Sequence, residues 1–267
     1  MLELRILTAL ILLPLVIALV LLAPTWLLAL VAGLVTLVAT WEWASLSGET
    51  AEIVKVSRII LVAVLLYLLW TARHDRLVLW VVALMALGWW SFALVWVTWW
   101  RREFPRPAKL FCGLLTLVPA WVATVALHQS PRGPVKLLFL LALIWAADSA
   151  AYFAGRAFGR HKLAPAVSPG KTWEGVAGGT LAMLVVALLG TWWVLPASGY
   201  FLILICVLTG WLSIVGDLSE SLFKREAGVK DSGVLFPGHG GVLDRIDSLT
   251  VAVPVFWIGL ALLEWLR

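Results

Sequence analysis

Long apolar runs recur along the 267-residue chain and constrain its fold more than any other feature. A helix that crosses a membrane needs about 20 mostly apolar residues. Nine segments approach that pattern, of which the third and sixth are short: Ile6–Leu22, Trp26–Trp41, Ile59–Thr71, Leu77–Trp96, Leu110–Leu127, Val135–Ala147, Val176–Leu195, Tyr200–Val215 and Leu249–Leu263. We therefore predict an all-α fold, a polytopic bundle of about nine transmembrane helices. Its two short segments either borrow flanking residues or are re-entrant.

The composition excludes the main alternatives to a membrane protein. Apolar residues make up 63% of the chain and charged residues 13%, whereas soluble domains average about half and about a quarter. Disorder requires low hydrophobicity and high net charge. The 18 tryptophans suit a membrane boundary, and we interpret pairs such as Trp89-Trp90 as interface anchors. Cys112 and Cys206 lie in apolar runs and are predicted to be small core residues.

Charged residues divide unequally between the two ends of the predicted bundle. Fifteen of the 20 Lys and Arg residues fall at the end that holds the N-terminus and segments 42–58, 97–109, 148–175 and 216–248. The positive-inside rule places this end in the cytoplasm. Thirteen of the 15 acidic residues lie there too. We therefore expect the chemistry to take place on the cytoplasmic side.

No linker or repeat divides the chain, so we predict one membrane-embedded domain over residues 1–267. Within it, residues 1–147 form the N-terminal spans. Residues 148–247 hold the polar catalytic segments with two further spans, and residues 248–267 form the last span. A secondary transporter usually carries its polar groups at the bilayer midplane, between repeated halves. Polar groups crowded at one boundary argue against that class.

The most informative polar segment runs from residue 216 to residue 247. Asp217, Glu220, Ser221 and Lys224 follow helical spacing and are expected on one helix face, with Gly228 ending the helix. A second helix opens with Asp244-Arg245-Ile246-Asp247, which puts its two acids on a shared face. A solvated loop of mixed charge is the alternative. Acids at apolar boundaries are costly, however, and this favours a functional site.

These residue types suit phosphate chemistry through a metal ion. Mg²⁺ prefers oxygen ligands, usually one or two carboxylates together with substrate phosphates and water. Asp217, Asp244 and Asp247 offer carboxylates from two helix ends that could meet. Lys and Arg neutralise charge that develops during phosphoryl or nucleotidyl transfer. His239, between two glycines, is either a ligand or phosphate contact or a loop-structuring residue.

A second polar segment, residues 148–175, begins with Asp148 at the end of an apolar run. Gly170-Lys171-Thr172 resembles part of a Walker loop, but Pro165 stands where that motif needs glycine and no strand precedes it. We therefore reject a P-loop. Ser168, Lys171 and Thr172 remain a candidate phosphate-contact set. The alternative, that Ser168 or Thr172 caps the next helix, is compatible because helix N-termini bind anions.

These motifs together resemble the phosphatidate cytidylyltransferase (CDP-diglyceride synthase) family of bacteria. The strongest part of the resemblance comprises Ser221, Phe223, Lys224, Arg225, Lys230, Asp231, Gly233, Phe236, Pro237, His239, Gly240, Gly241, Asp244, Arg245 and Asp247. Ser168–Gly175, the Asp148–Tyr152 stretch and Trp41-Glu42-Trp43 are similar to bacterial members as well. Ala150 departs from the family, whose members often carry glycine there, and this questions close backbone packing at that point.

The resemblance implies that the protein joins CTP and phosphatidate to give CDP-diacylglycerol and pyrophosphate, with Mg²⁺ and with a second metal ion left open. Implied catalytic residues are Asp217, Lys224, Arg225, Asp231, Asp244, Arg245 and Asp247. Implied phosphate contacts are Ser168, Lys171, Thr172, Ser221, Lys230, His239, Gly240 and Gly241, and Asp148 joins Asp217, Asp244 and Asp247 as a metal candidate.

The expected location is a bacterial inner membrane, with the active site facing the cytoplasm. Expected partners are CTP, phosphatidate and membrane lipid, without nucleic acid, and a homodimer is left open. A CTP- or ATP-dependent lipid-alcohol kinase is the main alternative, because it would use similar carboxylates but release a nucleoside diphosphate.

Overall fold

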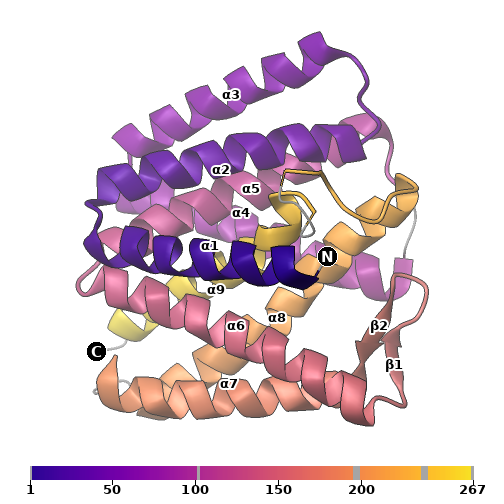
Figure 1. The fold of residues 1–267 in the computed structure, drawn as a ribbon. Helices are drawn as coiled ribbons and strands as arrows, with labels where there is room; N and C mark the ends of the chain where they lie inside the picture. The colour runs from indigo at the N-terminus through magenta and orange to yellow at the C-terminus, as the bar shows by residue number, and fades with distance from the viewer. Residues whose placement is uncertain (1, 101–102, 195–198, 236–239, 266–267) are drawn as a thin grey trace.

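The computed structural model describes residues 2–100, 103–194, 199–235 and 240–265. Helices account for nearly all of this described chain (Figure 1). They are α1 (Leu2–Leu22), α2 (Thr25–Leu46), α3 (Glu52–Thr71), α4 (Arg76–Val95), α5 (Arg106–Gln129), α6 (Gly133–Phe158), α7 (Trp173–Trp193), α8 (Gly199–Glu226) and α9 (Leu243–Trp265). A π-helical turn, η1 (Trp96–Trp100), extends α4. The predicted polytopic helical bundle is confirmed.

Eight helices of the described chain are long and apolar enough to cross a membrane, and α1 contributes a shorter apolar stretch, Leu10–Leu22. The two segments predicted to be short are complete helices of 20 and 26 residues, α3 and α6. The sequence runs stopped at charged residues, whereas both helices continue through them. For α6 this adds the turns that carry Asp148 and the residues after it.

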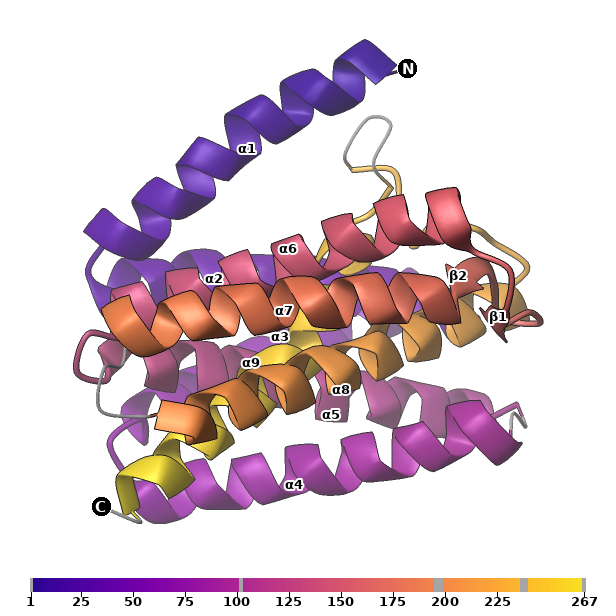
Figure 2. The ribbon, with the colours of Figure 1, turned by 90° about the horizontal axis from the view of Figure 1, so that it is seen from below.

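The helices run back and forth between two ends of the bundle (Figures 1 and 2). Helices α6 and α7 pack against each other, α8 packs against α9, and α5 lies against α2, α4 and α9. Helix α1 diverges from the bundle toward its own N-terminus (Figure 2). The end that carries most of the basic residues therefore holds the connections α2–α3, α6–α7 and α8–α9.

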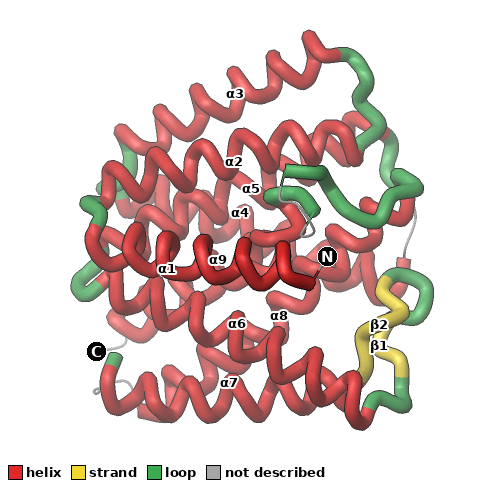
Figure 3. Tube along the Cα trace, viewed as in Figure 1, coloured by secondary structure: helices red, strands yellow, loops and turns green. Residues whose placement is uncertain are grey.

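One small element is not helical. Strands β1 (Lys162–Ala164) and β2 (Ser168–Thr172) form an antiparallel hairpin between α6 and α7, with Lys162 opposite Thr172 (Figure 3). So short a stretch carries no period-2 pattern, and the hairpin was not predicted. It leads directly into α7 and so fixes where that helix starts.

The tryptophan prediction is wrong for one pair. Trp89 and Trp90 are buried, and the Trp89 indole N–H donates to Thr116 Oγ1 at 3.0 Å. They belong to an aromatic core at the basic-rich end, in which the Trp96 and Phe223 ring centroids lie 4.9 Å apart. Aromatic rings bury large apolar areas, and the interior of this bundle offers more such contact than its boundary. Cys112 and Cys206 are free and buried, as predicted.

Candidate functional site

A cavity of about 540 Å³ opens at the basic-rich end, between α6, α7, α8, α9 and the β-hairpin. Four carboxylates line it: Asp148 from α6, Asp217 from α8, and Asp244 and Asp247 from α9. Ser168, Lys171 and Thr172 line it from the hairpin. The two polar segments identified in the sequence therefore face one space, although about 50 to 100 residues separate them.

Glycines bring the helices close enough to build this cavity. A Cβ on Gly179 of α7 would lie 3.0 Å from the Ala147 carbonyl oxygen of α6. A Cβ on Gly216 of α8 would lie 2.6 Å from the Asp247 carbonyl oxygen of α9. Position 150 of α6 therefore does not need to be glycine for α6 and α7 to pack closely. The glycines of α7 already leave room for the side chains of α6.

Lys171 reaches the carboxylates from the hairpin. Its Nζ lies 2.6 Å from Asp217 Oδ2, and Asp148 and Asp247 also interact electrostatically with it. Both side chains of this ion pair are about a quarter to a third exposed, so the pair remains open to solvent. One lysine ammonium thus stands among three acids, in a position where it could meet an incoming phosphate.

The hairpin also settles the helix-cap alternative for one residue. Thr172 is the N-cap of α7, and its Oγ1 accepts a hydrogen bond from the Gly175 N–H at 3.1 Å. Ser168 lies in β2 and is not a cap. Thr172 lines the cavity as well, so the capping and phosphate-contact interpretations remain compatible.

Asp244 is held by a dense hydrogen-bond network. Its Oδ1 accepts from Lys224 Nζ at 2.6 Å, and its Oδ2 accepts from Ser232 N–H, Ser232 Oγ and Gly241 N–H at 2.8 to 2.9 Å. Gly240 precedes with φ of +83°, a conformation that suits glycine. The Asp244 side chain therefore holds the turn into α9 in place, and it also lines the cavity.

Lys224 occupies the space between two acids. Besides Asp244, it pairs with Glu220 at 3.4 Å, one helical turn back on α8. Glu220 is 2% exposed and also interacts with Asp247. Ser221 Oγ donates to Asp217 Oδ1 at 3.3 Å. The predicted shared face of α8 is confirmed, and it packs against the acidic start of α9.

Glu42 is a residue whose importance the sequence analysis missed. It is buried in α2, and its carboxylate accepts from the N–H groups of Val242 and Leu243 at 2.9 and 2.8 Å and from Ser232 Oγ at 3.0 Å. These are free amides at the start of α9, where a negative charge is stabilising. The sequence already contained a clue to this role. Burying an acid between two tryptophans of an apolar run costs free energy unless the acid has a hydrogen-bond partner.

Comparison with known proteins shows which family the chain belongs to. The model of the cytidylyltransferase family matches residues 3–263. The chain belongs to the cytidylyltransferase family. Phosphatidate cytidylyltransferase of Pseudomonas aeruginosa is 45% identical over 277 residues, covering 96% of each chain. The enzyme of the same name from Haemophilus influenzae is 47% identical over 174 residues, covering 58% of this chain and 60% of its own.

Not every residue implied by the family resemblance lines the cavity. Arg225 donates to the carbonyl oxygens of Val167 and Val229 at 3.4 and 3.2 Å, which ties α8 to neighbouring loops. Several others likewise lie outside the lining, and their roles stay predictions: Ser221, Lys224, Lys230, Asp231, Gly240, Gly241 and Arg245. His239 lies outside the described residues. Conversely, Tyr152 and Arg156 of α6 line the cavity, and Arg156 donates to the Tyr152 hydroxyl at 3.3 Å.

The carboxylates of the cavity have the ligand chemistry for a metal ion, but not the spacing. Asp148, Asp217 and Asp247 supply only oxygen atoms to one cavity, which is the chemistry Mg²⁺ prefers. Across the described residues, however, no three His, Cys, Asp or Glu side chains converge closely enough to hold an ion. Lys171 pairs with Asp217, and Asp244 already accepts four bonds. The ligand chemistry fits, while metal ligation by Asp244 requires its network to rearrange.

Proposed function

We propose that this member of the cytidylyltransferase family condenses CTP with phosphatidate, giving CDP-diacylglycerol and pyrophosphate, in the carboxylate-lined cavity. The observation that carries the proposal is the meeting of Asp148, Asp217, Asp247 and Lys171 around one space at the boundary of an apolar bundle. The name of the Pseudomonas relative, which matches nearly the whole chain, supports the same reaction.

The lining of the cavity offers apolar surface for a lipid and charged groups for phosphates. Met183 and Ile214 give it an apolar wall, whereas Lys171 and Arg156 lie on its polar side. Helix α7 also exposes large apolar side chains, including Leu181, Val185 and Leu188, as a helix in contact with lipid does. A phosphatidate molecule would enter sideways from the membrane with its phosphate toward Lys171, and CTP would enter from the aqueous side.

In the reaction, an oxygen of the phosphatidate phosphate attacks the α-phosphorus of CTP. A new phosphorus–oxygen bond forms as the bond between the α-phosphorus and the bridging oxygen breaks, and pyrophosphate leaves with the electron pair. The nucleophile is already ionised, so no dedicated general base is required. Lys171 neutralises charge among the gathered phosphates, while Thr172 and the start of α7 orient one of them.

We propose Mg²⁺ as the metal, held by substrate phosphates together with carboxylates drawn from Asp148, Asp217 and Asp247. When bound, it would supply charge neutralisation at the transferring phosphate. We further propose that the carboxylate end faces the cytoplasm of a bacterial inner membrane, because fifteen of the 20 Lys and Arg residues lie at that end. We also propose that the protein can form a homodimer and that it binds no nucleic acid.

The proposal is tested with purified full-length protein in detergent, phosphatidate, Mg²⁺ and each of the four nucleoside triphosphates. We expect pyrophosphate release with CTP that depends on phosphatidate. Release of a nucleoside diphosphate instead would support the lipid-alcohol kinase and refute the cytidylyltransferase.

A further inference from the structure

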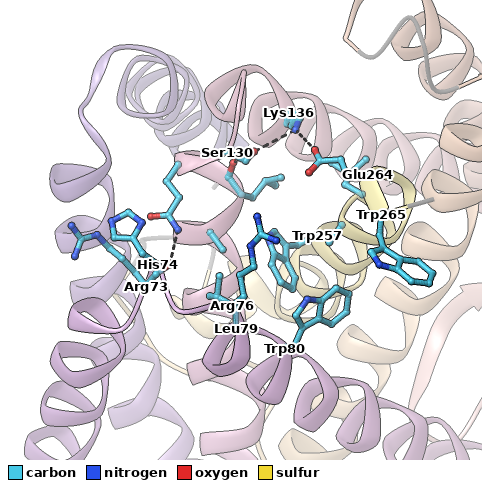
Figure 4. A pocket seen from close by; sticks show the side chains of 15 residues that line it. Arg73, His74, Arg76, Leu79, Trp80, Ser130, Lys136, Trp257, Glu264 and Trp265 are labelled. Carbon is cyan, nitrogen blue, oxygen red and sulfur yellow. Dashed lines mark hydrogen bonds and ion pairs between the residues drawn. The ribbon is translucent and has the colours of Figure 1, made fainter. Parts of the chain in front are cut away.

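A second large cavity lies at the opposite end of the bundle. It measures about 680 Å³ and is formed by the start of α4, the end of α5, the start of α6 and the end of α9. Helices α6 and α9 run from this cavity to the carboxylate cavity, so the two spaces are a helix length apart. Figure 4 shows Arg76 extending from α4 into this second cavity beside Trp257, with Lys136 and Glu264 at its rim.

Its charge is the reverse of the first cavity's. Three basic residues line it, Arg73, Arg76 and Lys136, against one acid, Glu264. Only five of the 20 Lys and Arg residues fall at this end of the bundle, so three of those five line one space. Basic residues are depleted on the outer side of membrane proteins. Their concentration in one cavity therefore calls for a cause beyond topology.

Two of the three cations are available to a ligand. The Arg73 guanidinium stacks over the Trp70 ring at 4.1 Å and donates to the Trp70 carbonyl oxygen, so it is already engaged. Arg76 is exposed, and no carboxylate of the described chain pairs with it. Lys136 is 3% exposed, yet its contacts are long: 3.2 Å to Glu264 Oε1 and 3.4 Å to Ser130 Oγ.

The Lys136–Glu264 pair is unequal. The Lys136 side chain is buried, whereas that of Glu264 is 60% exposed. Burying an ammonium is costly unless it is well paired, and a solvated carboxylate at 3.2 Å pairs it weakly. An anion inside the cavity would complete its hydrogen bonds. Gln129 and Ser130 lie on the same wall.

The remaining walls indicate a lipid rather than a soluble anion. The ring centroids of Trp80 and Trp257 lie 5.6 Å apart with the rings tilted by 56°, and Trp265 lies exposed at the rim. Trp side chains gather at the level of lipid headgroups. Leu79, Leu127 and Leu260 supply apolar surface between them. A phosphate in reach of two cations, next to apolar and indole surface, matches the headgroup region of an anionic phospholipid.

We propose that this cavity binds the phosphodiester headgroup of an anionic phospholipid, with Arg76 and Lys136 contacting the phosphate. The site lies away from the catalytic carboxylates, and with a single acid it lacks the donors that a metal would need. It therefore binds lipid without transforming it, and anchors the ends of α4, α5, α6 and α9 to the leaflet opposite the active site.

Native mass spectrometry of the full-length protein in detergent tests this, with phosphatidylglycerol or phosphatidylcholine added at equal concentration. Phosphatidylglycerol lacks the terminal phosphate that the proposed reaction requires, so the outcome is independent of the proposed function. We expect a preference for phosphatidylglycerol that falls about fivefold in Arg76→Gln, the loss of one cation at an anionic headgroup. Arg76 is exposed, so this variant should fold.

Two matched variants separate this cavity from other sites. Arg132→Gln removes a cation at the same end but outside the cavity, where Arg132 donates to the carbonyl oxygens of Trp193 and Val194. Lys171→Gln removes a cation from the carboxylate cavity. Both should retain phosphatidylglycerol binding. Equal binding of the two lipids, an equal loss in Arg132→Gln, or competition by soluble glycerol phosphate at the lipid's own concentration would overturn the proposal.

Discussion

The two ends of this bundle carry cavities of similar size and opposite charge. The carboxylate cavity is lined by four acids together with Lys171, whereas the opposite cavity is lined by Arg73, Arg76 and Lys136 together with the single acid Glu264. Helices α6 and α9 contribute to both. An excess of carboxylates binds polyphosphates only with cations as intermediaries, whereas an excess of cations binds an anion directly. The same scaffold therefore presents a site for chemistry at one end and a site for binding at the other.

The largest expected effect is at the acids of the carboxylate cavity. Asp217→Asn and Asp247→Asn keep the side-chain size and remove a charge. Losing a charge that is proposed to hold the metal should cost several kcal/mol of transition-state stabilisation. At about 1.4 kcal/mol per tenfold, turnover at saturating substrates should fall at least about a hundredfold. Glu220→Gln should reduce turnover less, because Glu220 lies behind Lys224 and outside the cavity lining. An equal loss in Glu220→Gln would mean that the Glu220–Lys224 pair contributes to turnover as much as the carboxylates that line the cavity.

Lys171→Gln tests whether the lysine of this cavity meets a phosphate. Losing a hydrogen bond to a charged group costs about 1.5–3 kcal/mol, so kcat/KM for CTP or phosphatidate should fall about ten- to a hundredfold. Lys162→Gln, in β1 of the same hairpin, is the matched control, because Lys162 is exposed and does not line the cavity. Unchanged kinetics in Lys171→Gln would leave this hairpin with only the capping role of Thr172.

Glu42→Gln should weaken the fold more than the chemistry. The variant keeps the size of the side chain but replaces an acid that accepts from two free amides of α9 and from Ser232. A free-energy loss of about 1–3 kcal/mol is expected, measured as a lower thermal midpoint in detergent. Glu52→Gln is the control, since the Glu52 side chain is 69% exposed and its ion pair with Lys55 contributes little. Equal midpoints for the two variants would show that the Glu42 cap is dispensable.

Gly216→Ala acts on the α8–α9 pair that carries Asp217 and Asp247, and it should reduce turnover less than the loss of either carboxylate. Its Cβ would lie 2.6 Å from the Asp247 carbonyl oxygen, so α8 and α9 must separate slightly at the cavity. Overpacking of this kind costs about 1–3 kcal/mol and should lower both the thermal midpoint and turnover. Gly88→Ala, in the middle of α4, places its Cβ in open space and gains helix propensity. A stable and fully active Gly216→Ala protein would contradict the close packing described here.

The smallest expected effect on catalysis is at the opposite cavity. Arg76→Gln should leave turnover with CTP and phosphatidate within about twofold of the wild type, since no part of this cavity reaches the carboxylates. Initial rates at saturating substrates measure this. A large loss of turnover would show that the opposite cavity is needed for the reaction, and it would contradict the separation of catalysis from lipid binding.

Patterns within short stretches of the sequence predicted the helices and several contacts within them. Helical spacing placed Asp217 and Lys224 on one face, Gly228 takes the positive φ expected after a helix, and Thr172 caps α7. These features depend on residues within a turn or two of one another. They are therefore visible in sequence.

Long-range contacts were beyond the reach of such patterns. Glu42 bonds to residues about 200 positions away, and no periodicity relates α2 to the start of α9. The burial of Trp89 and Trp90 depends on which helices surround α4. The basic cavity depends on four helix ends meeting, and the sequence pattern did not relate its three cations to one another.

The most direct measurement of the central claim follows the label of CTP into lipid. Full-length protein is given phosphatidate, Mg²⁺ and CTP radiolabelled at either the α- or the γ-phosphate, and the extracted lipid is counted. We predict that α-label alone enters the lipid, that Asp217→Asn lowers this transfer at least about a hundredfold, and that Glu264→Gln at the opposite end does not. Transfer of the γ-label, or α-label transfer at the wild-type rate in Asp217→Asn, would contradict a nucleotidyl transfer centred on the carboxylate cavity.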